Sequence, residues 1–127
     1  NDSRKLKDVK FLGLIKEKEL LYEYIYHAKL FIYPSYIESM SMMMLEVASF
    51  KTPMICADIS ENKDIFTEEE VLFSKAMDSE DLSNKIMWSL SNYNKMENMA
   101  LNAFIRLKKE YLWSDIAKKY DECYQKL

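Results

Sequence analysis

Two carboxylates, Glu38 and Glu46, lie in a stretch of the chain where their chemistry could serve a ligand. Seven residues separate them, within a segment that runs from residue 34 to residue 48. The apolar run before this segment, residues 30–33, is typical of a buried strand, and the run after Ser41 is typical of a helix. Open α/β sheets bind ligands where a strand ends and a helix begins, and free N–H groups at a helix start favour an anion. The spacing therefore predicts a ligand site at this junction.

Apolar periodicity, together with capping and turn residues, predicts the strands and helices around these carboxylates. Strands are predicted at residues 9–12, 30–33, 54–57 and 71–73, and Gly13 ends the first of them. Helices are predicted at residues 17–29, 41–50, 79–92, 94–109 and 113–125, with Asp78 or Ser79 and Asn94 as caps. Residues 1–8 are expected to be a frayed lead-in, and residues 58–67 a loop with at most one helical turn.

Apolar strands that alternate with helices indicate an α/β fold with a parallel sheet buried on both faces. The helices at the end of the chain are expected to pack around this sheet. Three of the predicted helices each have one apolar face that should be buried. This face consists of Leu21, Ile25 and Ala28 in residues 17–29, of Met44, Val47 and Ala48 in residues 41–50, and of Leu82, Ile86 and Leu90 in residues 79–92.

The composition limits the classes of protein to consider. At 127 residues, with 49% apolar and 31% charged residues, the chain suits one soluble globular domain. A net charge of −3 and only two arginines, Arg4 and Arg106, leave no basic stripe, so we expect no nucleic-acid partner. The single glycine excludes a glycine-rich phosphate loop. Cys56 and Cys123 lack metal-ligand spacing, and no signal peptide or membrane-spanning run is visible, so we expect a cytoplasmic protein.

The pattern Pro-Ser-x-x-Glu-x7-Glu-x-Ala, from Pro34 to Ala48, resembles a motif of the retaining glycosyltransferases with the GT-B fold, family four in particular. Further matching segments cover nearly the whole chain in the family's order. They are Val9-Lys10-Phe11-Leu12-Gly13, Thr52-Pro53-Met54-Ile55-Cys56-Ala57-Asp58, Leu72-Phe73 and Trp113-Ser114-x-Ile116-Ala117-x-x-Tyr120. The resemblance implies that residues 1–127 form a single, partial C-terminal domain with a Rossmann-like sheet that binds a nucleotide-sugar.

The resemblance also assigns roles to individual residues. Glu46 would accept hydrogen bonds from the ribose hydroxyls, and Glu38 would face the donor sugar close to the reacting centre, where it is the candidate catalytic residue. The other residues expected to bind the donor are Ser39, Met40, Ser41, Met42, Gly13 and Lys16. We expect neither a metal nor a cofactor besides the donor substrate, because this fold neutralises the diphosphate with basic side chains and helix ends.

The resemblance implies partners as well. Relatives carry an N-terminal domain that holds the acceptor, so this chain alone is expected to be inactive. The full protein would transfer a sugar with retention to a glycan, lipid or polysaccharide precursor, and peripheral membrane association of that protein is a further expectation. The last helix of relatives crosses back to the N-terminal domain, which makes Trp113 and Tyr120 candidate docking residues.

The expected sheet has an open edge. In the family's sheet order, two strands that this chain lacks separate the strand at residues 9–12 from the strand at residues 30–33. An unpaired edge is a template for pairing with another strand. Either residues 9–12 move beside residues 30–33, or another chain pairs there, which would allow self-association.

Two departures from the family pattern and two other interpretations remain. Ser39 and Ser41 stand where relatives have glycines, and no glycine follows Ala48 at the helix end. Each carboxylate alone would also fit a solvated helix face or a helix cap.

The whole chain could instead be a non-catalytic Rossmann-like interaction module, or another GT-B protein such as a nucleotide-sugar epimerase or a phosphorylase-like protein. Loss of nucleotide affinity on Glu46→Ala would separate a donor-binding domain from a scaffold.

Overall fold

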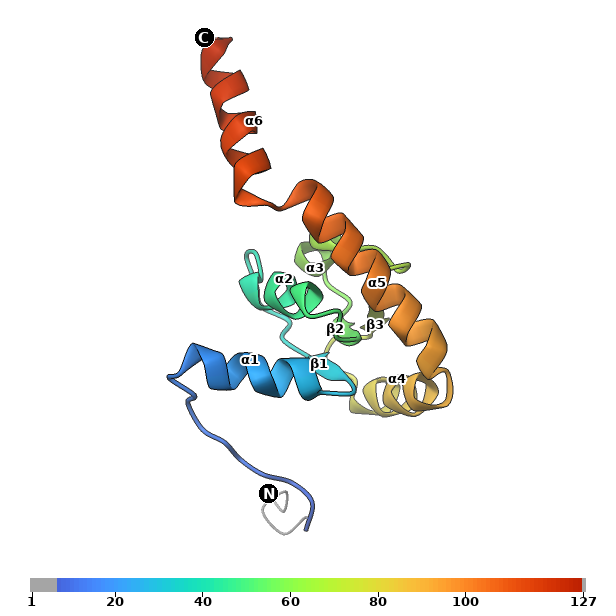
Figure 1. Cartoon of the computed structure of the whole chain (residues 1–127). Coiled ribbons are helices and arrows are strands. Elements are labelled where there is room, and N and C mark those ends of the chain that lie inside the picture. Colours follow the sequence, from blue (N-terminus) through green and yellow to red (C-terminus); the bar gives the residue numbers. More distant parts are fainter. Residues whose placement is uncertain (1–6, 127) are drawn as a thin grey trace.

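The computed structural model describes residues 7–126, which fold into a three-stranded parallel sheet and six helices (Figure 1). The elements in chain order are α1 (Lys18–His27), β1 (Phe31–Tyr33), α2 (Met42–Ser49), β2 (Met54–Ala57), α3 (Ser60–Ile65), β3 (Leu72–Ser74), α4 (Ser79–Ser91), α5 (Tyr93–Glu110) and α6 (Trp113–Gln125). This arrangement confirms the predicted α/β fold with a parallel sheet and a helical C-terminus. Part of the expected lead-in, residues 1–6, lies outside the described residues.

The sheet has the strand order β1-β2-β3, and helices connect each parallel pair. All four residues of β2 are buried, as expected for the central strand of a sheet covered on both faces. β1 pairs with β2 in the register Phe31 to Met54 and Tyr33 to Cys56. Because parallel strands end at the same edge of the sheet, the segments that follow β1, β2 and β3 lie at one end of the molecule.

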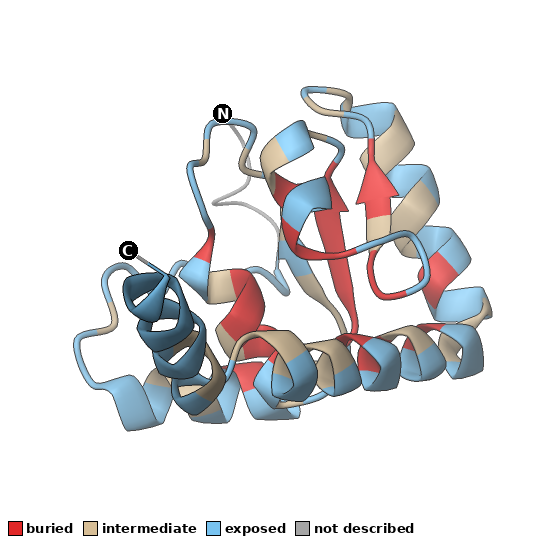
Figure 2. Ribbon diagram, turned by 90° about the horizontal axis from the view of Figure 1, so that it is seen from above, coloured by how far each residue is buried: buried red, intermediate tan, exposed pale blue. Residues whose placement is uncertain are grey.

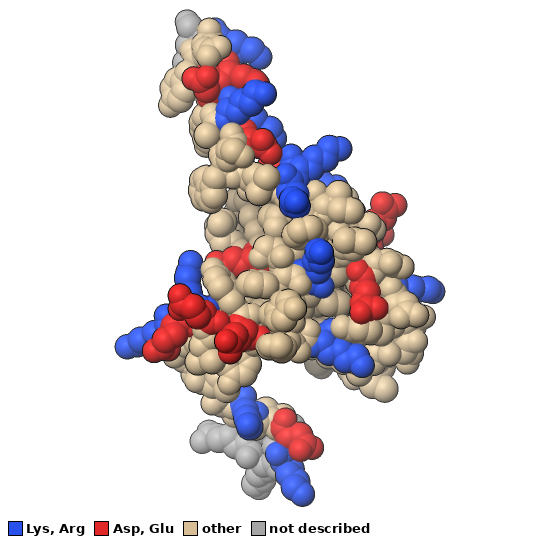
Figure 3. Space-filling model, in the orientation of Figure 1, with Lys and Arg blue, Asp and Glu red and all other residues tan. Residues whose placement is uncertain are grey.

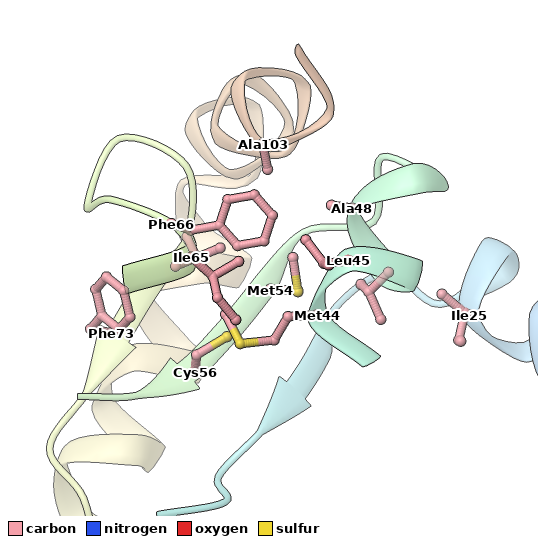
Figure 4. Close-up of a cluster of buried hydrophobic side chains, with 12 residues drawn as sticks. Ile25, Met44, Leu45, Ala48, Met54, Cys56, Ile65, Phe66, Phe73 and Ala103 are labelled. Atoms are coloured by element: carbon pink, nitrogen blue, oxygen red, sulfur yellow. The ribbon is translucent and has the colours of Figure 1, made fainter. Parts of the chain in front are cut away.

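The hydrophobic core lies between the sheet, α2 and α5 (Figures 2 and 4). Buried residues concentrate in the strands and on the helix faces turned toward them. Phe66 is fully buried and points toward Ala103 of α5, and Met44 and Met54 belong to the same buried cluster. The predicted buried face of α2, Met44, Val47 and Ala48, is confirmed. That face fixes the rotation of α2 and therefore the direction in which Glu46 points.

The prediction of a strand at residues 9–12 is wrong. This segment has no regular secondary structure, and Val9, Phe11 and Leu12 are 45%, 68% and 49% exposed. A strand needs a hydrogen-bonded neighbour, and no strand among the described residues lies beside this one. The expectation that residues 9–12 move beside β1 is therefore also wrong. β1 keeps an open edge within the described chain, and pairing of another chain at that edge stays a prediction.

Smaller differences concern the helices. α3 spans six residues and so exceeds the single turn expected between residues 58 and 67. α5 begins at Tyr93, with Asn92 rather than Asn94 as its cap. In α4, Leu90 is 46% exposed whereas Ser89 is buried. The Ser89 hydroxyl donates to the Lys85 carbonyl, so a small polar residue occupies the inward position without losing its hydrogen bond.

The last helix also departs from the prediction. α6 has no buried residue and projects away from the sheet (Figure 1), although it was expected to pack around it. The segment at Tyr111 and Leu112 interrupts the helical path after α5 and redirects the chain outward. In the described part of the chain, no helix combines the length and the apolarity needed to cross a membrane.

Candidate functional site

The candidate site lies at the carboxyl end of β1, where residues 34–41 lead into α2. Pro34 follows the strand directly, and its missing N–H group ends the ladder there. A hollow of about 440 Å³ beside this segment is lined by Tyr33, Pro34, Ser35, Tyr36 and Ile37. A ligand at the end of a parallel strand would therefore meet this loop and the first turn of α2.

Glu38 is held by two hydroxyl groups. The Tyr33 hydroxyl donates to Glu38 Oε1 at 2.5 Å, and Ser35 Oγ donates to the same oxygen at 2.7 Å. The hydrogen bonds from Tyr33 and from Ser35 lower the pKa of the Glu38 carboxyl, because both favour its ionised form. Burial, and then the bond to Glu38, raise the pKa of the Tyr33 hydroxyl, which therefore keeps its proton. Glu38 is a carboxylate at neutral pH, and its Oε2 has no partner among the described residues.

Glu46 sits one turn into α2, roughly 6 Å along the helix axis from Met42 at 1.5 Å per residue. Its side chain is 28% exposed and meets two residues of α1. The Tyr22 hydroxyl donates to Glu46 Oε1 at 3.3 Å, and Lys18 Nζ lies 3.9 Å from that same oxygen. Lys18 and Tyr22 are four residues apart, so they share one face of α1. Glu46 Oε2 has no partner among the described residues and can accept a hydrogen bond from a ligand.

The segment between the two carboxylates forms the start of α2. Met40 is 49% exposed and Met42 is 53% exposed, and Ser39 is exposed as well. Ser41 is the N-cap residue of α2 and is only 3% exposed, and its hydroxyl makes no hydrogen bond of normal geometry with another described residue. A buried hydroxyl without a partner is costly, and the first N–H groups of a helix have no partner within it. An anion at this helix start would give both kinds of donor a partner.

Gly13 and Lys16 lie in the segment that precedes α1, and both are exposed. Gly13 has a φ of 65°, a backbone conformation that suits glycine, and open space surrounds its α-carbon. No hydrogen bond or ion pair between described residues joins Gly13 or Lys16 to either carboxylate. The structure thus groups Glu38, Glu46 and residues 39–42 around the start of α2, and leaves the other two candidates on the preceding segment.

Three residues of this site were not found from the sequence: Lys18, Tyr22 and Tyr33. Tyr22 lies 24 positions from Glu46, and only the packing of α1 beside α2 brings the two together. Tyr33 lies five positions before Glu38. A polar hydroxyl at the end of an apolar strand, Leu-Phe-Ile-Tyr, was the one available signal for its role.

The site can accept hydrogen bonds from hydroxyl groups of a ligand. Each of the two carboxylates has one oxygen without a partner among residues 7–126, and a carboxylate can accept O–H donors from a sugar. Within residues 7–126, no group of three or more histidine, cysteine, aspartate or glutamate side chains is arranged to hold a metal ion. The arrangement suits a polyhydroxylated ligand with an anionic part at the start of α2.

Comparisons with known proteins identify what this chain resembles. The sequence model of "Glycosyl transferases group 1" matches residues 2–106. Sucrose-phosphate synthase from Thermosynechococcus elongatus superposes with a TM-score of 0.82 at 25% identity, over 93% of this chain and 30% of that one. No curated protein matches the chain by sequence.

Two further solved structures share the fold at lower identity. Anabaena HepE in complex with UDP-glucose gives a TM-score of 0.83 at 19% identity, over 99% of this chain and 35% of that one. The C-terminal domain of the group 1 family glycosyl transferase LpcC from Francisella tularensis gives 0.72 at 16% identity, over 81% and 53%. The chain therefore spans about a third of the synthase and of HepE, and about half of the LpcC domain.

Proposed function

The chain belongs to the group 1 glycosyltransferases, with the fold of a GT-B C-terminal domain, and on this basis we propose that it binds the nucleotide-sugar donor of a retaining sugar transfer. The observation that carries the proposal is the pair of carboxylates around the start of α2, each with one oxygen that no described residue contacts by a hydrogen bond. HepE was solved with UDP and with UDP-glucose, which makes uridine nucleotides the first ligands to test here.

Each part of the donor has a group that suits it. Glu46 accepts hydrogen bonds from the two ribose hydroxyls, with its position set by Tyr22 and Lys18. The start of α2, with the Ser41 hydroxyl, receives the diphosphate, since helix N–H groups favour negative charge. Glu38 orients hydroxyls of the sugar and favours the positive charge that develops on its anomeric carbon.

The reaction proposed for the whole enzyme breaks the bond between the anomeric carbon and the diphosphate and forms a bond to an acceptor hydroxyl. The nucleoside diphosphate leaves with the bonding electron pair, and the acceptor loses its proton. The acceptor is a glycan, lipid or polysaccharide precursor held by a second domain. We expect this chain alone to bind the donor without a metal and to catalyse no transfer, because it spans only about a third of the synthase and of HepE.

The decisive experiment is an NMR titration of the chain with UDP, GDP and ADP, repeated for Glu46→Ala. We expect one nucleotide to shift the amide signals of residues 38–46. Loss of hydrogen bonds to a charged group, about 1.5–3 kcal/mol, should weaken binding by roughly tenfold or more in the variant. Glu97→Ala, at an exposed position of α5, is the matched control and should bind as the wild type does.

Two results would count against the proposal. A chain that binds none of the three nucleotides would behave as a scaffold module. Binding that Glu46→Ala leaves unchanged would place the nucleotide elsewhere on the surface.

A further inference from the structure

The family motif includes Ser35 and Glu38 but not the residue that contacts Glu38 most closely, Tyr33. We propose that Tyr33 is a positioning residue. Together with Ser35 it holds Glu38 as a fixed acceptor, so that the site favours a donor whose sugar offers hydroxyl groups over one whose sugar carries a carboxylate. The second half of this inference rests on the proposed donor function, whereas the first half concerns the free protein alone.

Tyr33 is well placed to fix another side chain because it is itself held in a strand. It is the last residue of β1 and pairs in register with Cys56, which is fully buried in β2. Its ring stacks on that of Phe31, with the ring centres 6.4 Å apart. The hydroxyl therefore extends from a rigid part of the sheet toward the more irregular loop. A residue that contacts a site residue from a regular secondary-structure element helps to keep that site residue in its productive geometry.

Both hydrogen bonds to Glu38 go to one oxygen, and this determines what the other oxygen can do. Tyr33 and Ser35 both donate to Oε1, at 2.5 and 2.7 Å. Two donors on one oxygen restrict rotation of the carboxylate, which leaves Oε2 directed away from both. A sugar hydroxyl can donate to Oε2 without displacing either protein partner.

Within residues 7–126, no basic side chain forms an ion pair that neutralises the negative charge of Glu38. The side chains that face it are the Tyr33 and Ser35 hydroxyls, and no lysine or arginine of the described chain forms an ion pair with it. Hydroxyl donors stabilise an anion but do not cancel its charge. A hydroxyl of a neutral sugar is therefore attracted to Glu38, and the carboxylate of a uronic acid is repelled by it.

The hydrogen bonds can be tested in the ligand-free chain. We would follow the side-chain carboxyl carbon signal of Glu38 by NMR as the pH is varied, in the wild type and in Tyr33→Phe. Phenylalanine keeps the ring that packs on Phe31 and removes only the hydroxyl donor. We expect Glu38 to take up its proton at a higher pH in Tyr33→Phe than in the wild type. The control Tyr24→Phe, at an exposed position of α1, should leave the Glu38 titration unchanged.

The sugar preference is tested by calorimetric titration with UDP, UDP-glucose and UDP-glucuronic acid. We expect the wild type to bind UDP-glucose about tenfold more tightly than UDP-glucuronic acid. Tyr33→Phe should weaken UDP-glucose binding several-fold and leave UDP binding unchanged. Glu38→Gln should reduce the ratio of the affinity for UDP-glucose to the affinity for UDP-glucuronic acid.

The possible results separate the two halves. An unchanged Glu38 titration in Tyr33→Phe would overturn the positioning role, whatever the chain binds. Equal affinity of the wild type for both nucleotide-sugars, or an equal loss of UDP and UDP-glucose affinity in Tyr33→Phe, would overturn the sugar preference. A chain that does not bind UDP at all would overturn the proposed donor function together with the sugar preference, while the Glu38 titration would still decide the role of Tyr33.

Discussion

The two cysteines differ in their environment, and this difference predicts their reactivity. Cys56 is fully buried in the central strand, and burial raises the pKa of its thiol to about 12. Cys123 is exposed on α6. The thiolate is the reactive form, so Cys56 is both shielded and protonated at pH 8.

We expect a thiol-specific reagent at pH 8 to modify Cys123 of the folded chain at once. Cys56 should react only after the chain is unfolded in denaturant. Cys123→Ser is the control and should leave no reactive thiol in the folded chain. Rapid modification of Cys56 in that variant would mean that β2 opens far more often than a central strand should.

At the level of single residues, sequence spacing predicted the two carboxylates but not the groups that hold them. Glu38 and Glu46 sit on one continuous strand, loop and helix, so local pattern is enough to place them at the same end of the sheet. Tyr22 meets Glu46 only because Ile25 packs into the core and turns α1 toward α2. Such a contact depends on how two helices pack, which no single segment of sequence specifies.

Among the secondary-structure elements, the entry to α4 contains a strained residue. Met77 has a φ of 60° and is 80% exposed, immediately before the Asp78 cap of the helix. A residue with a side chain in the left-handed region destabilises the folded state by about 1–2 kcal/mol. Replacing it with glycine removes this strain, but part of the gain is offset because glycine increases the conformational entropy of the unfolded chain.

We expect Met77→Gly to raise the free energy of unfolding by about 0.5–1 kcal/mol, measured by urea denaturation. Met87→Gly is the matched control, because Met87 is 62% exposed in the middle of α4. There the same substitution should lower the free energy of unfolding by about 1 kcal/mol. A loss of stability in both variants would show that the Met77 side chain contributes more than its backbone strain costs.

The end of α2 shows why element boundaries were predicted better than their details. The sequence lacks the glycine expected after Ala48, yet a left-handed residue, Lys51, still follows the end of α2, at a φ of 56°. The Lys51 N–H donates to the Ala48 carbonyl at 3.0 Å, and the Thr52 N–H reaches the Val47 carbonyl at 3.5 Å. Lys51 Nζ also lies 4.6 Å from the ring centre of Phe104, a contact that offsets part of the strain. Apolar periodicity predicts where a helix lies, but not which residue accepts strain at its end.

The strand predicted at residues 9–12 failed for a reason that belongs to the whole sheet. Three of its four residues are apolar, Val9, Phe11 and Leu12, and its local pattern is that of a strand. Sequence pattern can report β propensity, but a strand forms only where another strand offers hydrogen bonds. The described chain has three strands in one sheet, and this segment pairs with none of them although β1 keeps an open edge.

Across the whole molecule, α6 stands apart from the rest of the fold. It buries no residue, although Trp113, Ile116, Tyr120 and Tyr124 recur at helical spacing and so share one face. Trp113 is 76% exposed and Tyr120 is 64% exposed. In Figure 3 the charged side chains of this helix lie mainly along one side and uncharged side chains along the other. An amphipathic helix whose apolar face covers nothing in its own domain cannot contribute much to that domain's stability.

We therefore expect deletion of residues 113–127 to change the free energy of unfolding by less than about 0.5 kcal/mol, measured by urea denaturation of the full and shortened chains. Ala103→Asp is the control for sensitivity, because Ala103 is fully buried in α5 and an unpaired charge there should unfold much of the population. A large loss of stability on deletion would mean that α6 folds back onto the sheet in solution. Unchanged stability would leave the aromatic face of α6 available to another domain, and an acceptor domain added in trans to the full chain should then protect Trp113 from fluorescence quenchers.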